Sequence, residues 1–350
     1  MGSVKVRKYA AVTGDGRVVV EEGPVPEPGR GELLVEVRAS LISPGTEMGF
    51  VKARRERPDP SAPTRPFGYA NSGVVLDVGE GCEGFEPGMR VACMGAGYAL
   101  HATHACVPKN LCLPLPENVS FEEGAFCHLA ATALQAIRRT APELGEWGAV
   151  VGLGIIGQIA CQLARLSGCF VMGLDLLPRR LEIALKNGLD RAVNVSEEDP
   201  VEAAMEFTEG EGLDWAIIAF GGEATEALSK VASMMKTAPD GHKMGRITVV
   251  GGCEARLRFP VPLGNLDIRA SSRTGPGYHD ERWERGADYP PVFVRWDTRR
   301  NLRLVLRLIS EGRLNVKSLI THTFPLDRAP EACELLIERP NEALGVILKP

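Results

Sequence analysis

The stretch best suited to chemistry is a glycine-rich turn that links an apolar run to a helical pattern. It contains Gly152, Gly154 and Gly157. Glycine at these places permits a tight turn, close approach of a pyrophosphate to the backbone, and close packing of the helix on the strand. The free N–H groups at the helix start, around Ile155 and Ile156, then bind the phosphates. A dinucleotide site is predicted; the alternative is a strand–helix turn that binds nothing.

An acidic residue follows at the distance that such a site requires. A second apolar run ends in Asp175, eighteen residues after Gly157. A carboxylate there accepts hydrogen bonds from the ribose hydroxyls and repels a 2′-phosphate. We therefore predict NAD as the cofactor. NADP stays open, because Arg179 and Arg180 come soon afterwards and Arg180 is placed to contact the nucleotide.

The elements that position these residues alternate between strand and helix patterns from about Ala149 onward. This alternation is typical of a doubly wound parallel sheet. Strands are expected at 171–174, 192–195, 215–220 and 247–252, with helices at 180–187 and 225–235. The first third instead shows short strand patterns divided by Pro–Gly turns. Further helices are expected over 122–139 and 298–311, and a long loop over 273–294.

Bulk properties exclude several classes of function. A net charge of −5 gives no support for nucleic acid or an anionic membrane as a partner. No apolar run reaches the length of a membrane span, and Met1 to Lys8 lacks the apolar core of a secretory signal. The nine cysteines are odd in number and form no CxxC pair, which is typical of reduced thiols. We expect a cytoplasmic protein that acts on a small molecule.

Several motifs together resemble one family. They are PEPGRGEL at 26–33, GEG at 79–81 with FEPGMRV at 85–91, the glycine turn, and LITHTFPL at 319–326. Over nearly its whole length the chain resembles the medium-chain dehydrogenase/reductase superfamily, in its zinc-type, alcohol dehydrogenase-like branch. The resemblance implies an α/β fold with a GroES-like catalytic domain over 1–125, a Rossmann domain over 126–272, and a substrate loop and return to the catalytic domain over 273–350. It also implies hydride exchange with a nicotinamide in a cleft between the domains, and a homodimer or homotetramer.

The chain departs from that family at its catalytic metal. Zinc-using members have a cysteine where this chain has Pro44, and Gly-His-Glu where it has Gly68-Tyr69-Ala70. The third ligand position holds Cys127. One thiolate does not form a three-ligand catalytic zinc site. We therefore predict a member that works without zinc.

The family's structural zinc is also not expected. It needs four closely spaced cysteines, and the corresponding stretch of this chain has only three, with different spacing. The string His101, His104 and Cys106 has an HxxHxC pattern. It falls where the family has a strand, so we interpret it as structural, with a metal site as the alternative.

Without a Lewis acid, protein groups must assist the reacting oxygen. Tyr69 stands at the position of the second metal ligand, where its phenol would donate a hydrogen bond to a developing alkoxide. A nearby cation would lower the pKa of that phenol. The alternative is that Tyr69 only fills the metal cavity. Thr46 aligns with a proton-relaying hydroxyl. Glu47 aligns with an acid behind the metal, and we favour a structural carboxylate paired to an arginine. His128, expected to face the cleft with Cys127, either titrates near neutral pH or is a packing residue.

Two polar, aromatic segments at 271–280 and 288–296 are unusual for the superfamily. They resemble a subgroup found alone or fused to a sugar-dehydrogenase-type domain in bacterial carbohydrate pathways. The segments supply the donors Arg273, Tyr278, His279, Tyr289 and Arg295, which suit a polyhydroxylated or anionic substrate. The alternative is a loop that forms a dimer contact. We predict an NAD(H)-dependent oxidoreductase that interconverts a hydroxyl and a ketone on a sugar, polyol or cyclitol. A reductase of activated C=C bonds and a non-catalytic dinucleotide-binding protein remain open.

Overall fold

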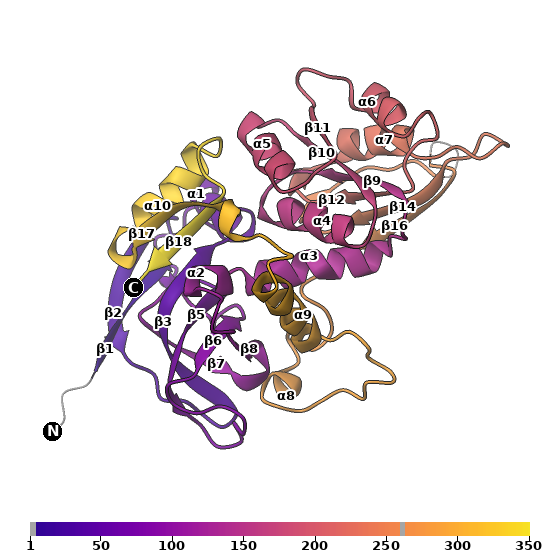
Figure 1. The fold of residues 1–350 in the computed structure, drawn as a ribbon. Helices are drawn as coiled ribbons and strands as arrows, with labels where there is room; N and C mark the ends of the chain where they lie inside the picture. Colours follow the sequence, from indigo (N-terminus) through magenta and orange to yellow (C-terminus); the bar gives the residue numbers. More distant parts are fainter. Residues whose placement is uncertain (1–4, 260–262) are drawn as a thin grey trace. The chain divides into compact units, whose positions relative to one another are not determined.

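The computed structural model describes residues 5–259 and 263–350 and divides into two units (Figure 1). Unit 1 consists of Met1–Ala131 and Thr274–Pro350, and unit 2 of Thr132–Arg273. Part of the N-terminal segment considered above, residues 1–4, lies outside the described residues. Within the described residues no helix has both the length and the apolar character needed to span a bilayer.

Unit 2 contains the predicted parallel sheet. Its six strands follow the order β11-β10-β9-β12-β14-β16, and every neighbouring pair is parallel. The strands are β9 (Trp147–Val151), β10 (Phe170–Asp175), β11 (Arg191–Asn194), β12 (Trp215–Ile218), β14 (Met244–Val249) and β16 (Asn265–Ala270). The strand order reverses between β9 and β12. Sheets of this kind bind ligands at such a reversal, beyond the carboxyl ends of the strands.

Helices connect these strands and cover the sheet (Figure 1). They are α3 (Cys127–Thr140), α4 (Ile155–Leu166), α5 (Pro178–Lys186), α6 (Pro200–Phe207) and α7 (Thr225–Met234). A separate two-stranded sheet pairs β13 (Gly222–Glu223) with β15 (Cys253–Glu254). Covered strands need consecutive buried residues, and Ala149 and Val150 of β9 are both fully buried. Gly148 of β9 leaves room for a neighbour, since a Cβ there would lie 2.0 Å from the ring of Trp215.

Unit 1 is built on a mostly antiparallel sheet of the order β17-β18-β3-β5-β6-β8, with β7 also paired to β3. A second, three-stranded sheet has the order β2-β1-β4. The strands are β1 (Val6–Val12), β2 (Val18–Pro24), β3 (Glu32–Ile42), β4 (Arg65–Pro66), β5 (Ala70–Val78), β6 (Arg90–Met94), β7 (His104–Pro108), β8 (Cys112–Pro114), β17 (Ile320–Pro325) and β18 (Gly345–Lys349). The first half of β3 alternates buried and half-buried residues, as a strand with one face on a core does.

Some expected elements differ in detail. The helix expected over 122–139 is two helices: the short α2 (Phe121–Gly124), which starts at a capping box formed by Ser120 and Glu123, and α3, which starts at Cys127. The loop expected over 273–294 contains a short helix, α8 (Glu281–Glu284), capped by Asp280. The helix α1 (Thr46–Glu56) was not expected, since it buries only three residues. The chain ends with α9 (Thr298–Ser310), α10 (Ala329–Glu338) and β18.

Candidate active site

Tyr69 lies just before β5 and is half-buried in unit 1. Its hydroxyl forms hydrogen bonds with the side chains of Ser43 and Thr46. Burial, and secondarily the negative charge of Glu47, raise the pKa of Tyr69 above its ordinary range, and those hydrogen bonds only partly offset the shift. The lowering of this pKa that a nearby cation would cause is not seen, because burial raises the pKa instead. Tyr69 is a neutral phenol and a hydrogen-bond donor across the physiological pH range.

Glu47, near the start of α1, is buried and pairs with a histidine. The predicted pairing with an arginine is wrong. Its Oε2 accepts a hydrogen bond from the Ser43 N–H at 2.7 Å and lies 3.2 Å from His101 Nε2. The other ring nitrogen of His101 is 2.9 Å from Ser40 Oγ. A buried carboxylate needs donors, and His101, itself fully buried, supplies one.

His128, the second residue of α3, is buried and contacts Tyr69. Its Nδ1 lies 2.8 Å from the Tyr69 carbonyl oxygen. A carbonyl only accepts, so Nδ1 carries the hydrogen and Nε2 is the acceptor nitrogen of the neutral ring. Burial lowers the pKa of His128 to about 4. His128 is therefore neutral at physiological pH, and its titration near neutral pH is not supported.

Four rings form an aromatic cluster made of Tyr69, His128, Tyr278 and His279. The ring centroids are 4.5 Å apart for Tyr69 and His128, 5.7 Å for His128 and Tyr278, and 3.9 Å for Tyr278 and His279. Tyr278 is buried, and its hydroxyl oxygen accepts a hydrogen bond from the Ala96 N–H at 2.8 Å. The unusual segment after Arg273 thus contributes directly to the surroundings of Tyr69.

The other residues predicted to bind substrate have different partners. Tyr289 donates a hydrogen bond from its hydroxyl to Asp280 at 2.6 Å, which raises the pKa of Tyr289 to about 12. Arg295 is exposed, with its guanidinium 4.9 Å from the ring centroid of Trp296. Arg273 is exposed and has a φ of 61°, a left-handed conformation that is uncommon outside glycine.

The residues at the family's zinc-ligand positions do not suit zinc. Pro44 offers no side-chain donor, and Tyr69 is a neutral phenol. Cys127, which we expected to face the cleft, is buried, and its Sγ lies 3.8 Å from the Leu302 carbonyl oxygen. Burial raises the pKa of the Cys127 thiol, and one thiol alone does not form a three-ligand catalytic zinc site. Within 5–259 and 263–350 no three or more His, Cys, Asp or Glu side chains are grouped to hold a metal ion.

The glycine turn in unit 2 has the space that a pyrophosphate needs. A Cβ added at Gly154 would meet no atom within 4 Å, whereas one at Gly157 would lie 1.9 Å from the Gly152 carbonyl oxygen. Gly152 has a φ of 91°, and its N–H donates a hydrogen bond to the Leu174 carbonyl oxygen at 2.8 Å. Gly154 caps α4 without any side-chain hydrogen bond, so the helix start is open to an anion. The turn therefore fits a dinucleotide.

Asp175, at the end of β10, also anchors the turn, which sequence reasoning missed. Its Oδ2 accepts from the Leu153 N–H at 2.7 Å, and its Oδ1 from the Leu177 N–H at 2.9 Å. Arg180 Nη1 lies 3.6 Å from Oδ2. Each carboxylate oxygen has two lone pairs, so Asp175 retains acceptor capacity for ribose hydroxyls. The Arg180 charge weakens the repulsion that Asp175 exerts on a 2′-phosphate.

Comparisons with known proteins agree with this arrangement. The family model described as zinc-binding dehydrogenase matches residues 156–285, and the alcohol dehydrogenase GroES-like domain matches 29–117. The sorbitol dehydrogenase of Gallus gallus is 25% identical over 95% of this chain and 94% of that protein. An Escherichia coli oxidoreductase/dehydrogenase of unknown specificity superposes with a TM-score of 0.82 at 20% identity, covering 99% of both chains.

A putative zinc-binding dehydrogenase from Sinorhizobium meliloti, solved with NADP bound, superposes with a TM-score of 0.79 at 20% identity, covering 99% of this chain and 100% of its own. The chain belongs to the medium-chain dehydrogenase/reductase superfamily, a class of oxidoreductases. The predicted combination of a GroES-like domain with a Rossmann sheet is confirmed.

Proposed function

We propose that this protein is a zinc-independent, NAD(H)-dependent oxidoreductase that interconverts a secondary hydroxyl and a ketone on a sugar, polyol or cyclitol. The observation that carries the proposal is a neutral Tyr69 at a zinc-ligand position, hydrogen-bonded to Ser43 and Thr46. Similarity to a sorbitol dehydrogenase over most of both chains supports a polyol-like substrate. Nine free thiols support a cytoplasmic location, and a homodimer or homotetramer is part of the proposal.

In this proposal the bound nicotinamide supplies or accepts the hydride. Tyr69 donates its O–H to the substrate oxygen as negative charge develops there during reduction. The Tyr69 proton moves to the product oxygen as the alkoxide forms, and burial keeps the phenol protonated until that point. Thr46 is exposed, and together with Ser43 it returns a proton to Tyr69 from solvent. Glu47 and His101 hold Ser43 in place behind the phenol.

Substrate hydroxyls are proposed to contact the segment that begins at Arg273. Tyr278 lies in the aromatic cluster, and the exposed guanidinium groups of Arg273 and Arg295 suit polar or anionic substrate groups. Tyr289 is proposed to shape this segment through its bond to Asp280. His128, held neutral, orients the cluster through Tyr69.

Turnover of a panel of polyols and cyclitols with NAD and NADP tests the proposal. Oxidation of at least one polyol, and reduction of its ketone, is the expected result. If the protein instead reduces quinones or enones and oxidises no polyol, it is a reductase of activated C=C bonds. If the protein binds the dinucleotide but turns over neither the polyols and cyclitols nor the quinones and enones, it is a non-catalytic binding protein.

We predict that kcat/KM is at least about tenfold higher with NAD than with NADP, because Asp175 repels a 2′-phosphate. Arg180→Ala should widen that ratio further, since it removes the cation beside Asp175 and leaves the Leu153 and Leu177 hydrogen bonds intact. Steady-state kinetics with both cofactors measure the ratio. A strong NADP preference of the wild type would contradict the assignment.

We also predict that activity needs no zinc, because Pro44 has no side-chain donor and Cys127 alone does not form a three-ligand site. Metal analysis of purified protein should find far less than one zinc per chain, and incubation with a chelator should leave kcat unchanged. The idea fails if one tightly held zinc per chain is found and its removal abolishes turnover.

A further inference from the structure

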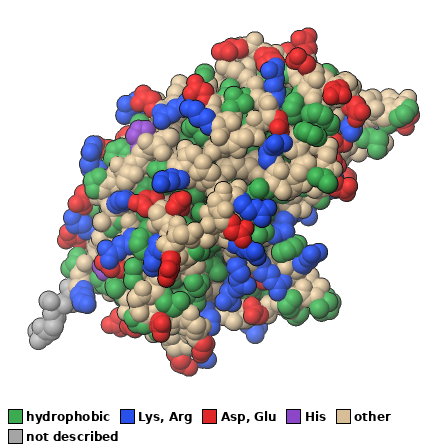
Figure 2. All heavy atoms as spheres, in the orientation of Figure 1, with side chains coloured by type: hydrophobic (Ala, Val, Ile, Leu, Met, Phe, Trp, Pro, Cys, Tyr) green, Lys and Arg blue, Asp and Glu red, His purple; other side chains and the backbone are tan. Residues whose placement is uncertain are grey.

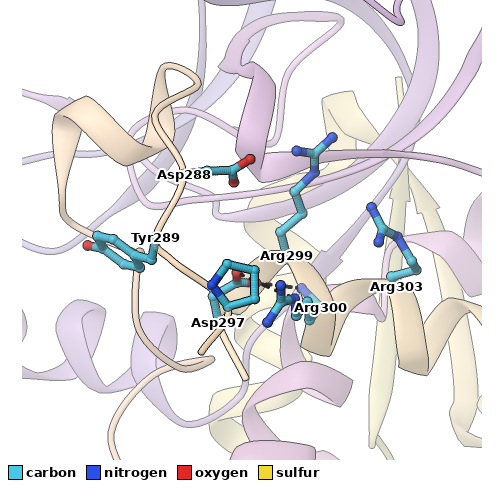
Figure 3. Close-up of a pocket in the computed structure, with 7 residues that line it drawn as sticks. Asp288, Tyr289, Asp297, Arg299, Arg300 and Arg303 are labelled. Atoms are coloured by element: carbon cyan, nitrogen blue, oxygen red, sulfur yellow. Dashed lines mark hydrogen bonds and ion pairs between the residues drawn. The ribbon is translucent and has the colours of Figure 1, made fainter. Parts of the chain in front are cut away.

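A polar cavity in unit 1 has no role in the proposed reaction. It is formed by the loop before α9 and by the first turns of that helix (Figure 3), and its volume is about 160 Å³, several times the ~30 Å³ of a liquid water molecule. The lining residues are Asp288, Tyr289, Pro291, Asp297, Arg299, Arg300 and Arg303. Three arginines therefore face two aspartates, and Figure 2 shows Lys and Arg side chains gathered over the region of α9.

One arginine and one aspartate in this cavity hold the loop in place. Asp297 is buried and caps α9 by accepting a hydrogen bond from the Arg300 N–H at 2.8 Å. Arg300 Nη1 donates to the carbonyl oxygens of Val294 at 3.0 Å and Arg295 at 2.7 Å. Its Nε lies 3.9 Å from Asp297 Oδ2 (Figure 3). Arg300 and Asp297 are therefore engaged in holding the loop, which leaves the single negative charge of Asp288 against the positive charges of two further arginines.

Those charges belong to Arg299 and Arg303, one helical turn apart on the same face of α9. Figure 3 shows both side chains extending to the same side of the helix. Arg299 Nε is buried and lacks a hydrogen-bond partner among the described residues, and neither guanidinium forms an ion pair with them. Like charges at this spacing repel each other, and a buried unpaired donor is unfavourable. An anion between the two guanidinium groups would relieve both effects.

The chemistry of the cavity selects the type of anion. Guanidinium groups match the paired oxygens of a phosphate. Asp288, on the other side of the cavity, is exposed and accepts hydrogen bonds, so it suits hydroxyl groups and disfavours a second negative charge. The Tyr289 hydroxyl already donates to Asp280. A phosphate monoester that also carries hydroxyl groups meets all these conditions.

We propose that Arg299 and Arg303 bind the phosphate group of a hydroxyl-bearing phosphate monoester in this cavity. The phosphate belongs either to the substrate, which would make the substrate a phosphorylated polyol, or to a separate ligand. Tyr289 provides a structural connection, because it lines the cavity and bonds to Asp280, the neighbour of His279 in the aromatic cluster. Only the substrate variant of this idea rests on the proposed function.

Binding of inorganic phosphate, measured by calorimetry at constant ionic strength with chloride as the reference ion, tests the site without turnover. We expect wild-type protein to bind one phosphate per chain and the double variant Arg299→Gln/Arg303→Gln to bind it at least tenfold more weakly. Arg307→Gln is the matched control, since Arg307 lies on the same helix but pairs with Glu311 outside the cavity. The site is overturned if the double variant binds phosphate as tightly as the wild type, or if Arg307→Gln loses as much affinity as the double variant. It is also overturned if the wild type binds no phosphate.

A second arm distinguishes the two sources of the phosphate. A hexitol and its phosphate monoester are compared as substrates. If the substrate carries the phosphate, kcat/KM is higher for the monoester, and the double variant loses that advantage and keeps its activity on the free hexitol. If the ligand is separate, the monoester binds to the wild type with no such advantage. Failure of all turnover would count against the proposed function and leave the binding result standing.

Discussion

Tyr69→Phe is expected to lower kcat for ketone reduction by roughly ten- to a thousandfold, the range seen when one donor to a developing oxyanion is lost. KM should change little, because the hydrogen bond strengthens mainly in the transition state. Phenylalanine keeps the ring that contacts His128 in the aromatic cluster, so the fold should be preserved. Steady-state kinetics with a thermal unfolding curve measure both expectations.

Thr46→Val is the companion variant. It removes the exposed hydroxyl that bonds to Tyr69 and leaves the phenol itself in place. A smaller loss of kcat than in Tyr69→Phe is expected, since Ser43 still contacts the phenol. Near-wild-type kcat in both variants would mean that Tyr69 only fills the vacated metal cavity. His128 would not then replace it as donor, because the hydrogen of its neutral ring is committed to the Tyr69 carbonyl.

The pH dependence separates a donor role from a change in packing. The pKa of Tyr69 is raised above its ordinary range, and that of His128 is lowered to about 4. Neither group titrates between about pH 6 and 9, so the ratio of wild-type to Tyr69→Phe kcat should be constant there.

The stability of the fold, in contrast to the kcat ratio, should depend on pH through His128. As the pH falls below about 6.5, the unfolded chain binds a proton at His128 that the folded chain refuses until about pH 4, which weakens folding over that interval.

The Rossmann sheet was largely predictable because its determinants are local. Its central strands are continuous apolar runs, and the glycine turn and Asp175 follow them at short, fixed distances. The edge strand β16 was missed because its residues alternate between exposed and half-buried and resemble a polar loop. The helix α1 was missed for a similar reason, since only Glu47, Met48 and Val51 of it are buried.

The candidate site was less predictable because its contacts join distant parts of the chain. The Pro44 and Tyr69 replacements were visible in the sequence, but the partner of Glu47 was not. His101 lies 54 positions away, and an arginine was an equally reasonable partner for a buried acid. The participation of Tyr278 in the aromatic cluster likewise depends on how the segment after Arg273 folds back. Spacing carries no information on contacts of this kind.

The glycine turn offers a pair of substitutions with opposite consequences. Gly154 has an extended backbone, with φ −66° and ψ −174°, and open space around its missing Cβ. Gly154→Asp should therefore fold well, since aspartate is a favoured helix N-cap. Its carboxylate would occupy the phosphate position, and two negative charges 4 Å apart repel by about 4 kcal/mol at an effective dielectric constant of 20. We expect dinucleotide affinity to fall at least a hundredfold with little loss of thermal stability.

Gly157→Ala should behave in the opposite way. Its Cβ would lie 1.9 Å from the Gly152 carbonyl oxygen, so α4 must shift away from β9. Overpacking of this kind costs about 1–3 kcal/mol of folding free energy, and the thermal midpoint should fall.

Gly154→Asn provides the charge control for Gly154→Asp, because asparagine keeps the size and capping ability of aspartate. This variant should lose much less dinucleotide affinity. Dinucleotide titration followed by protein fluorescence, with thermal unfolding of each variant, separates the two effects. Equal affinity of Gly154→Asp and wild type would mean that this helix start does not hold the pyrophosphate.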